Sequence, residues 1–287
     1  MKRVEAARGY GDRPDRMSDE GVRGMKRVEA AFRAARGKRA LLIGYATAGF
    51  PDLETSRRIC SSLLEHCDLL ELGIPFSDPV LDGPVIQESS SRALEAGFRV
   101  SDAFDLAREL RERTEKPLLA MTYYNPVHRM GHEAFAERAA RAGFDGLLVP
   151  DLPLEEAGGL RAAADSRDLA AVLFASMSTP DDRLRDIAGA TRGFLYCFAV
   201  KGTTGLRESL SAGLAPFTAR VRSLCDIPIA LGLGISSPGQ CREAGELADA
   251  VVVGSALVKA CLDALDSGAD PAAAAGRLAA SLREALG

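Results

Sequence analysis

The chain has 287 residues, of which 47% are hydrophobic and 26% charged, a balance typical of a globular protein and a length that suits one α/β barrel. Its net charge of −4 argues against a nucleic-acid partner, which usually needs a basic surface. No apolar stretch approaches the roughly 18 residues of a membrane span, and the amino-terminal region lacks the apolar segment of a secretory signal, so we expect a cytoplasmic protein.

The chain begins with a heptapeptide, MKRVEAA, at residues 1–7 that recurs at 25–31. The stretch between the two copies is rich in Gly, Arg and Asp and has almost no large apolar side chains, so it cannot offset its ordering entropy. We therefore expect residues 1–24 to be a disordered extension and residues 25–287 to form a single domain. That domain should begin with a short amphipathic helix carrying Val28 and Phe32.

From residue 39 onward, short apolar runs alternate with stretches of helical periodicity. Strands are predicted at 40–48, 69–74, 118–124, 146–150, 170–176, 194–199, 227–233 and 250–253. Helices are predicted at 53–66, 102–114, 133–142, 155–167, 181–189, 207–223 and 237–247. Strands without a polar face are typical of parallel sheets, so about eight such units predict a (β/α)₈ TIM barrel. A doubly wound sheet is the alternative, but no G-x-G-x-x-G follows the first strand.

The second predicted strand contains a carboxylate inside an apolar run. Glu71 lies in Leu69-Leu70-Glu71-Leu72-Gly73, where an ionised side chain is costly unless it is paired or used. Strand alternation allows Glu71 to point into the barrel mouth, where the active sites of such barrels lie. A structural carboxylate bonded to backbone is the other interpretation.

The loop after this strand, PFSDPVLDGPVIQ, is dense in Pro, Gly and Asp and should be irregular but stiff. Asp82 lies in it, eleven residues after Glu71, and is a candidate for a position over the mouth. Capping of a helix that begins near Val85 explains Asp82 equally well.

Glycine-rich turns follow the last three predicted strands. They are Lys201-Gly202-Thr203-Thr204-Gly205 after the sixth, Gly232-Leu233-Gly234 in the seventh and Gly254-Ser255 after the eighth. Glycines let backbone N–H groups approach an anion, and barrels often bind phosphate between the loops after strands seven and eight and an extra helix. That extra helix should begin near Ser255.

The cysteines do not suggest disulfides or a zinc site, because none form a C-x-x-C pair and several lie in apolar runs. They are expected to be buried free thiols in a reducing compartment. No metal site is expected. The six are Cys60, Cys67, Cys197, Cys225, Cys241 and Cys261.

Several motifs along the chain carry a resemblance. They are GYATAGFPD (44–52), ELGIPFSDPVLDGPVIQ (71–87), MTYYNPV (121–127), VPDLPLEE (149–156), LGLGIS (231–236) and VVVGSALVK (251–259). Together they resemble the tryptophan synthase alpha subunit family over residues 25–287, and the stretch 71–87 is similar to the signature of that family.

The resemblance implies a cofactor-free retro-aldol cleavage of indole-3-glycerol phosphate to indole and glyceraldehyde 3-phosphate. It also implies a beta-subunit partner, which receives the indole in an alpha–beta–beta–alpha tetramer. By this match Glu71 is the general acid–base and Asp82 stabilises charge at the indole N–H. The remaining matched positions are Tyr45, Thr47, Tyr123 and Tyr196 around the substrate, and Gly205, Gly232, Gly234, Gly254 and Ser255 around its phosphate.

Two departures from the family pattern stand out. The sixth-strand loop reads AVKGTTG where the family usually has a Ser-Arg pair before G-x-T-G, which concerns loop closure, and Gly44 stands where proline is common. Three other functions remain open: a Schiff-base aldolase using Lys201, a non-catalytic barrel that binds a partner, and a stand-alone indole-3-glycerol phosphate lyase.

Overall fold

A computed structural model describes residues 23–198, 211–232 and 234–287 of the chain. Within them, all strand pairs are parallel. The strands are β1 (Leu41–Thr47), β2 (Leu69–Gly73), β3 (Leu118–Met121), β4 (Gly146–Leu148), β5 (Ala170–Val172), β6 (Phe174–Ser176), β7 (Leu195–Phe198), β8 (Ile229–Gly232) and β9 (Ala250–Val253).

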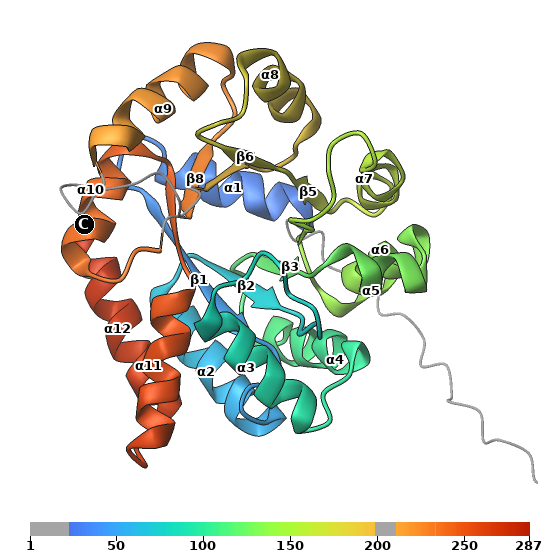
Figure 1. Ribbon diagram of the computed structural model, residues 1–287, viewed down its shortest axis with the longest axis vertical. Coiled ribbons are helices and arrows are strands. Elements are labelled where there is room, and N and C mark those ends of the chain that lie inside the picture. Colours follow the sequence, from blue (N-terminus) through green and yellow to red (C-terminus); the bar gives the residue numbers. More distant parts are fainter. Residues whose placement is uncertain (1–22, 199–210, 233) are drawn as a thin grey trace, which may run out of the picture.

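Helices surround these strands on the outside, except α1, which lies across one end of the barrel (Figure 1). They are α1 (Met25–Ala35), α2 (Leu53–His66), α3 (Pro84–Glu95), α4 (Val100–Arg111), α5 (Tyr124–Met130), α6 (His132–Ala142), α7 (Gly158–Asp165), α8 (Asp181–Ala190), α9 (Ser211–Leu224), α10 (Pro238–Leu247), α11 (Ser255–Asp266) and α12 (Pro271–Ala285). Among the described helices, none is long and apolar enough to cross a membrane.

The sheet closes into a barrel through a broken strand. The order of hydrogen-bonded neighbours runs β5-β4-β3-β2-β1-β9-β8-β7-β6, so β5 and β6 are its two ends. Only Leu173 separates these ends in sequence, and its carbonyl accepts a hydrogen bond from the backbone N–H of Tyr196 at 3.0 Å. The predicted strand 170–176 is therefore one barrel strand interrupted at Leu173, and the TIM-barrel prediction is confirmed.

Strand alternation divides the core into two clusters. Residues that point into the barrel, such as Ile43 and Leu69, form an interior cluster, while Leu42 and Leu70 pack outward in the cluster shared with the helices. Since every second residue faces the same way, the inward set continues from these positions toward the carboxyl ends of the strands.

Helix α1 closes the amino-terminal end of the barrel. Val28 is fully buried and Phe32 nearly so, both in the interior cluster, and the Phe32 ring lies 5.3 Å from that of Phe194. Arg27 bridges from α1 to the buried Asp145, whose second carboxylate oxygen accepts from Arg111. The prediction of a short amphipathic helix carrying Val28 and Phe32 is confirmed. The prediction of disorder falls almost entirely on residues 1–22, outside the described residues.

Two features near the barrel mouth bear on the site. The helix expected near Ser255 is α11, which begins at Ser255 itself with Gly254 as its N-cap residue. The predicted strand 118–124 is too long, because β3 ends at Met121 and Tyr124 already belongs to α5. The helix expected near Val85 is α3, which begins at Pro84, whereas α5 and α12 are additions to the expected helices.

Candidate active site

The candidate site begins where the inward-facing rows of β1 and β2 reach the barrel mouth. Two residues beyond the interior positions Ile43 and Leu69, these rows present Tyr45 and Glu71, which are register partners in the β1–β2 pair. Glu71 is only 1% exposed. The same backbone period that packs the barrel core therefore places a carboxyl group in its upper layer.

The Glu71 carboxyl group is buried with little compensation. Its Oε2 atom has no hydrogen-bond partner among the described residues. Burial, and secondarily the nearby Asp82 carboxylate, raise the pKa of Glu71 to about 8, and no backbone group of the described residues donates a hydrogen bond to oppose this rise. The interpretation of Glu71 as a carboxylate bonded to backbone is therefore wrong. An unpartnered buried carboxyl group with a raised pKa at a barrel mouth is typical of a residue that takes part in catalysis or binding.

Asp82 lies on the β2–α3 loop and faces the same region. Burial raises its pKa to about 6, partly offset by a hydrogen bond from the Tyr123 side chain. Tyr123 also holds the loop, because its hydroxyl accepts from the Leu81 backbone N–H at 3.0 Å. Helix α3 has Gly83 as N-cap and no side-chain cap, so the interpretation of Asp82 as a helix cap is wrong.

Aromatic rings at the mouth lie against glycines of neighbouring strands. A Cβ added at Gly73 would lie 2.1 Å from the Tyr45 hydroxyl oxygen, and one added at Gly232 would lie 2.6 Å from the Tyr196 ring. Burial, followed by the nearby carboxylates, raises the pKa of Tyr196 well above its usual value. Both tyrosines are therefore neutral hydroxyl groups held in fixed places beside Glu71.

Thr47 completes the β1 side of the site. It is 3% exposed, and its hydroxyl lies 2.7 Å from the Ser89 hydroxyl of α3 and donates weakly, at 3.4 Å, to the Tyr45 hydroxyl. The described residues thus bring Tyr45, Thr47, Tyr123 and Tyr196 to the same end of the barrel as the two carboxylates.

The glycines expected around a phosphate lie at the ends of β8 and β9. Gly232 ends β8, Gly234 has a φ of 69°, and Gly254 caps α11, of which Ser255 is the first residue. The amino terminus of a helix offers free N–H groups and a favourable dipole to an anion. Gly205, and Lys201 of the Schiff-base alternative, lie outside the described residues.

No cluster of three or more His, Cys, Asp or Glu side chains suited to a metal occurs in the described part of the chain. His128 and His132 are four residues apart, a spacing that suits a shared metal ion when both lie on one helix. Here Gly131, with a φ of 88°, separates α5 from α6 between them, and His132 Nε2 lies 3.0 Å from the Tyr124 hydroxyl.

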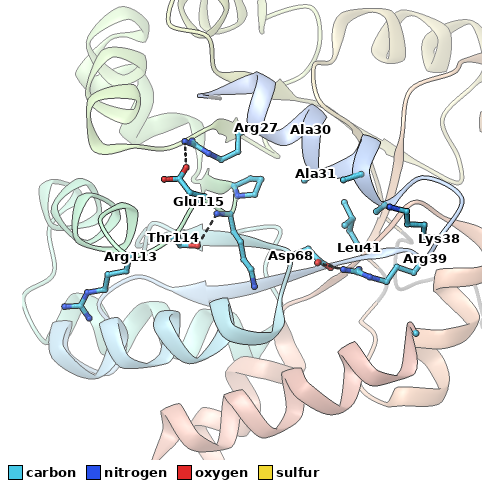
Figure 2. A pocket seen from close by; sticks show the side chains of 15 residues that line it. Arg27, Ala30, Ala31, Lys38, Arg39, Leu41, Asp68, Arg113, Thr114 and Glu115 are labelled. Atoms are coloured by element: carbon cyan, nitrogen blue, oxygen red, sulfur yellow. Dashed lines mark hydrogen bonds and ion pairs between the residues drawn. The ribbon is translucent and has the colours of Figure 1, made fainter. Parts of the chain in front are cut away.

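A cavity of about 830 Å³ lies at the opposite end of the barrel, between α1 and the loop around Glu115. Figure 2 shows Arg27 pointing toward Glu115 and Arg39 pointing toward Asp68 across it. Two of the five cations that line this cavity are thus paired with acids of the same cavity. In barrels of this type the amino-terminal end serves stability and the carboxyl end carries the chemistry, so we do not place the site here.

A much smaller pocket, about 10 Å³, lies beside Asp82 and contains residues that the sequence did not single out. Thr122 is 2% exposed and Ser90 4%, and both line this pocket with Asp82 and Tyr123. The Thr122 hydroxyl has no hydrogen-bond partner among the described residues. Thr122 lies within the MTYYNPV motif, but only its buried, unpartnered hydroxyl distinguishes it, and a sequence does not show burial.

Comparisons with known proteins identify the family of this chain. The family model for the tryptophan synthase alpha chain matches residues 32–286. The tryptophan synthase alpha chain of Synechococcus elongatus is 42% identical, covering 82% of this chain and 89% of the relative, and that of Thermococcus kodakarensis is 45% identical, covering 76% and 87%.

Solved structures extend the similarity to the fold. A structure of Mycobacterium tuberculosis tryptophan synthase has a TM-score of 0.82 at 35% identity, covering 91% of this chain and 98% of that one. The alpha chain of Legionella pneumophila has a TM-score of 0.83 at 31% identity, covering 91% and 97%. The chain belongs to the tryptophan synthase alpha chain family and is a lyase of tryptophan biosynthesis.

Proposed function

We propose that this chain cleaves indole-3-glycerol phosphate to indole and glyceraldehyde 3-phosphate, with Glu71 as general acid and base. The observation that carries the proposal is the Glu71 carboxyl group at the carboxyl end of β2. It is buried, its Oε2 has no partner within the described part of the chain, and it interacts electrostatically with Asp82. A pKa of about 8 keeps Glu71 protonated at neutral pH, while a pKa of about 6 leaves Asp82 mostly ionised. Two carboxyl groups in different surroundings can divide acid and charge-stabilising roles.

The reaction needs one proton donated and one proton accepted, and a single carboxyl group can do both in turn. Glu71 donates its proton to indole C3, which places positive charge near the indole N–H, where the Asp82 carboxylate stabilises it. The Glu71 carboxylate then accepts the proton of the glycerol hydroxyl on the carbon bonded to C3. That carbon becomes the aldehyde, the C3–carbon bond breaks, and its electron pair returns to the indole ring. Glu71 ends protonated, and water and a cofactor are not consumed.

We assign substrate positioning to the groups around these carboxylates. Tyr45, Thr47, Tyr123 and Tyr196 surround the indole and glycerol, since buried neutral hydroxyls and aromatic faces orient a substrate without competing for its proton. The phosphate is proposed to bind at Gly232, Gly234, Gly254 and Ser255, together with Gly205.

The partner is proposed to be a beta subunit that docks on the barrel mouth, in an alpha–beta–beta–alpha tetramer. Exposed large hydrophobic side chains within the described residues support this position. Val80 and Leu81, 78% and 59% exposed, lie in the loop beside Asp82, and Met177 follows β6. Leu53, 41% exposed, begins α2 after the β1 loop. Exposed apolar side chains around one opening are typical of a protein interface.

The alternatives of a stand-alone lyase and a non-catalytic barrel are less well supported. The relatives are named as alpha chains, and both carboxyl groups expected of the enzyme are in the site. The free, mostly buried cysteines agree with a proposed cytoplasmic location, where thiols stay reduced.

The test is an assay of the purified chain with indole-3-glycerol phosphate, alone and with a beta subunit from the same source. Indole and glyceraldehyde 3-phosphate should appear in equal amounts, faster with the partner present. Turnover without equimolar indole, or trapping of substrate on a lysine by borohydride, would contradict the proposal.

A further inference from the structure

We propose that the small pocket beneath the β2–α3 loop binds one ordered water, through which the Thr122 hydroxyl orients the Asp82 carboxylate. Thr122 is then a positioning residue that acts through Asp82 and does not touch the substrate. This inference rests on the role proposed above for Asp82 and names the side chains that prepare that carboxylate.

The size and lining of the pocket suit a single water. Its volume of about 10 Å³ is close to the roughly 10–15 Å³ that one water needs, and a buried water also needs two to four polar partners. Asp82, Ser90, Thr122 and Tyr123 supply polar groups to its wall, while Met121 and neighbouring apolar residues close it. A bulkier ligand does not fit.

Thr122, one of the residues that line this pocket, has a hydroxyl group that needs a hydrogen-bond partner. It is 98% buried and unpartnered in the described chain, a state that costs about 1–3 kcal/mol unless a partner is supplied. Ser90 is likewise buried and lines the same pocket. A water that accepts from Thr122 can donate to the Asp82 carboxylate and still contact Ser90, which satisfies all three groups.

The arrangement has a chemical consequence for Asp82. The titratable groups that face this carboxylate are Glu71 on β2, Tyr45 on β1, Tyr123 after β3 and Tyr196 on β7. All of them are neutral or acidic, so they do not stabilise its charge as a cation would. Hydrogen bonds from Tyr123 and from the water are then the means of keeping Asp82 ionised in a buried place.

The variant that tests this is Thr122→Val, which removes the hydroxyl but keeps the shape. Loss of one hydrogen bond to a charged group should raise the Asp82 pKa by about one unit. The acid limb of kcat/KM should move up by the same amount, so activity falls about fivefold at pH 6 but less than twofold at pH 7.5. Thr122→Ser should restore the wild-type profile. Thr218→Val is the matched control, since that buried hydroxyl bonds only to carbonyls of α9.

Two further measurements distinguish loss of the bridging water from a general packing defect. They also test the water bridge independently of the role proposed for Asp82. Carbon-13 NMR titration of Asp82 in the substrate-free protein should show the same rise in pKa, whether or not the acid limb belongs to Asp82. Ser90→Ala should weaken the same water, so the double variant should add little to Thr122→Val. A uniform loss of activity at every pH, an unmoved Asp82 titration, or a crystal structure with no water density in this pocket would overturn the inference. If Asp82→Asn leaves the acid limb in place while the NMR titration moves, the proposed role of Asp82 fails and the water bridge stands.

Discussion

The Tyr45 ring occupies the space directly over Gly73 of the neighbouring strand, so that a Cβ at position 73 would lie 2.1 Å from the tyrosine hydroxyl oxygen and 2.4 Å from Cζ. Real Cβ atoms do not approach so closely, and the aromatic ring is too rigid to bend away. The pair sits beside Glu71, which neighbours Tyr45 across β1–β2 and is two residues from Gly73. The shape of the mouth thus depends on a glycine and a tyrosine that fit each other.

Gly73→Ala should push the Tyr45 ring out of place. We expect a loss of about 1–3 kcal/mol in the free energy of unfolding, the usual cost of overpacking, and at least a tenfold drop in kcat/KM. Chemical denaturation and a steady-state indole assay measure the two effects. In the Tyr45→Leu background the same substitution should cost little stability, while Gly189→Ala in α8, where added atoms meet nothing within 4 Å, is the control. Equal destabilisation in both backgrounds would refute the steric explanation.

The pH dependence of kcat/KM should be bell-shaped. Activity needs Asp82 ionised and Glu71 protonated, so it should rise with a pKa of about 6 and fall with a pKa of about 8. Because the two groups interact, these limbs describe the pair. Asp82→Asn should remove the acid limb and lower kcat strongly while leaving measurable turnover, since Asp82 supplies charge and not the proton. If the acid limb of kcat/KM survives in Asp82→Asn, it reports the titration of another group and contradicts this prediction.

Glu71→Gln should make the protein more stable than wild type at high pH. The folded pKa of about 8 lies above the ordinary glutamate value of 4.5, so the wild-type acid contributes stability below pH 4.5 that is lost as pH rises through 8. A difference of one between the folded and unfolded pKa of this carboxyl group corresponds to roughly 1.4 kcal/mol of stability. Melting temperatures at pH 5 and pH 9 should therefore diverge between wild type and Glu71→Gln only at pH 9. Glu112→Gln, at the exposed end of α4, is the control for loss of a carboxylate.

Removal of residues 1–22 should leave the melting temperature and kcat nearly unchanged, because their composition offers few side chains able to join a core. Removal of residues 1–36 should be severe. It takes away Val28 and Phe32 from the barrel interior and the Arg27 partner of buried Asp145, at a cost of at least about 4 kcal/mol. Thermal melts of the two truncated proteins decide this, and a drop of several degrees for the shorter deletion contradicts it.

Much of the fold was predictable because its causes are local. Strand alternation fixed the inward direction of Glu71 once the apolar run around it was identified as a strand, and that direction agrees with the structure. The break at Leu173 was not predictable, since it depends on a hydrogen bond from its N–H to Thr191 Oγ1, 18 residues away. The start of α5 at Tyr124 was also missed. The Asp151 carboxylate accepts from the Tyr124 N–H at 2.8 Å, a contact between distant segments.

The candidate site likewise contains residues that the sequence predicts and residues that it does not. Residues at strand ends were found by periodicity and motif, whereas the role of Asp82 as cap or site residue was left open by spacing alone. The structure shows that Asp82 does not cap α3, since Gly83 is the N-cap residue and no side chain bonds to the first turn. Thr122 and Ser90 gave no signal, because their importance lies in the pocket that they share with Asp82 and not in their neighbours along the chain.

The central claim is that the Glu71 carboxyl group carries the proton in both directions during cleavage. The most direct measurement is single-turnover indole release by Glu71→Gln, compared with wild type at pH 7 and saturating indole-3-glycerol phosphate, with circular dichroism to verify the fold. The account predicts a loss of at least 10³-fold in the cleavage rate with substrate binding retained, since an amide neither donates nor accepts the required proton. A folded Glu71→Gln protein that releases indole within tenfold of the wild-type rate would contradict it.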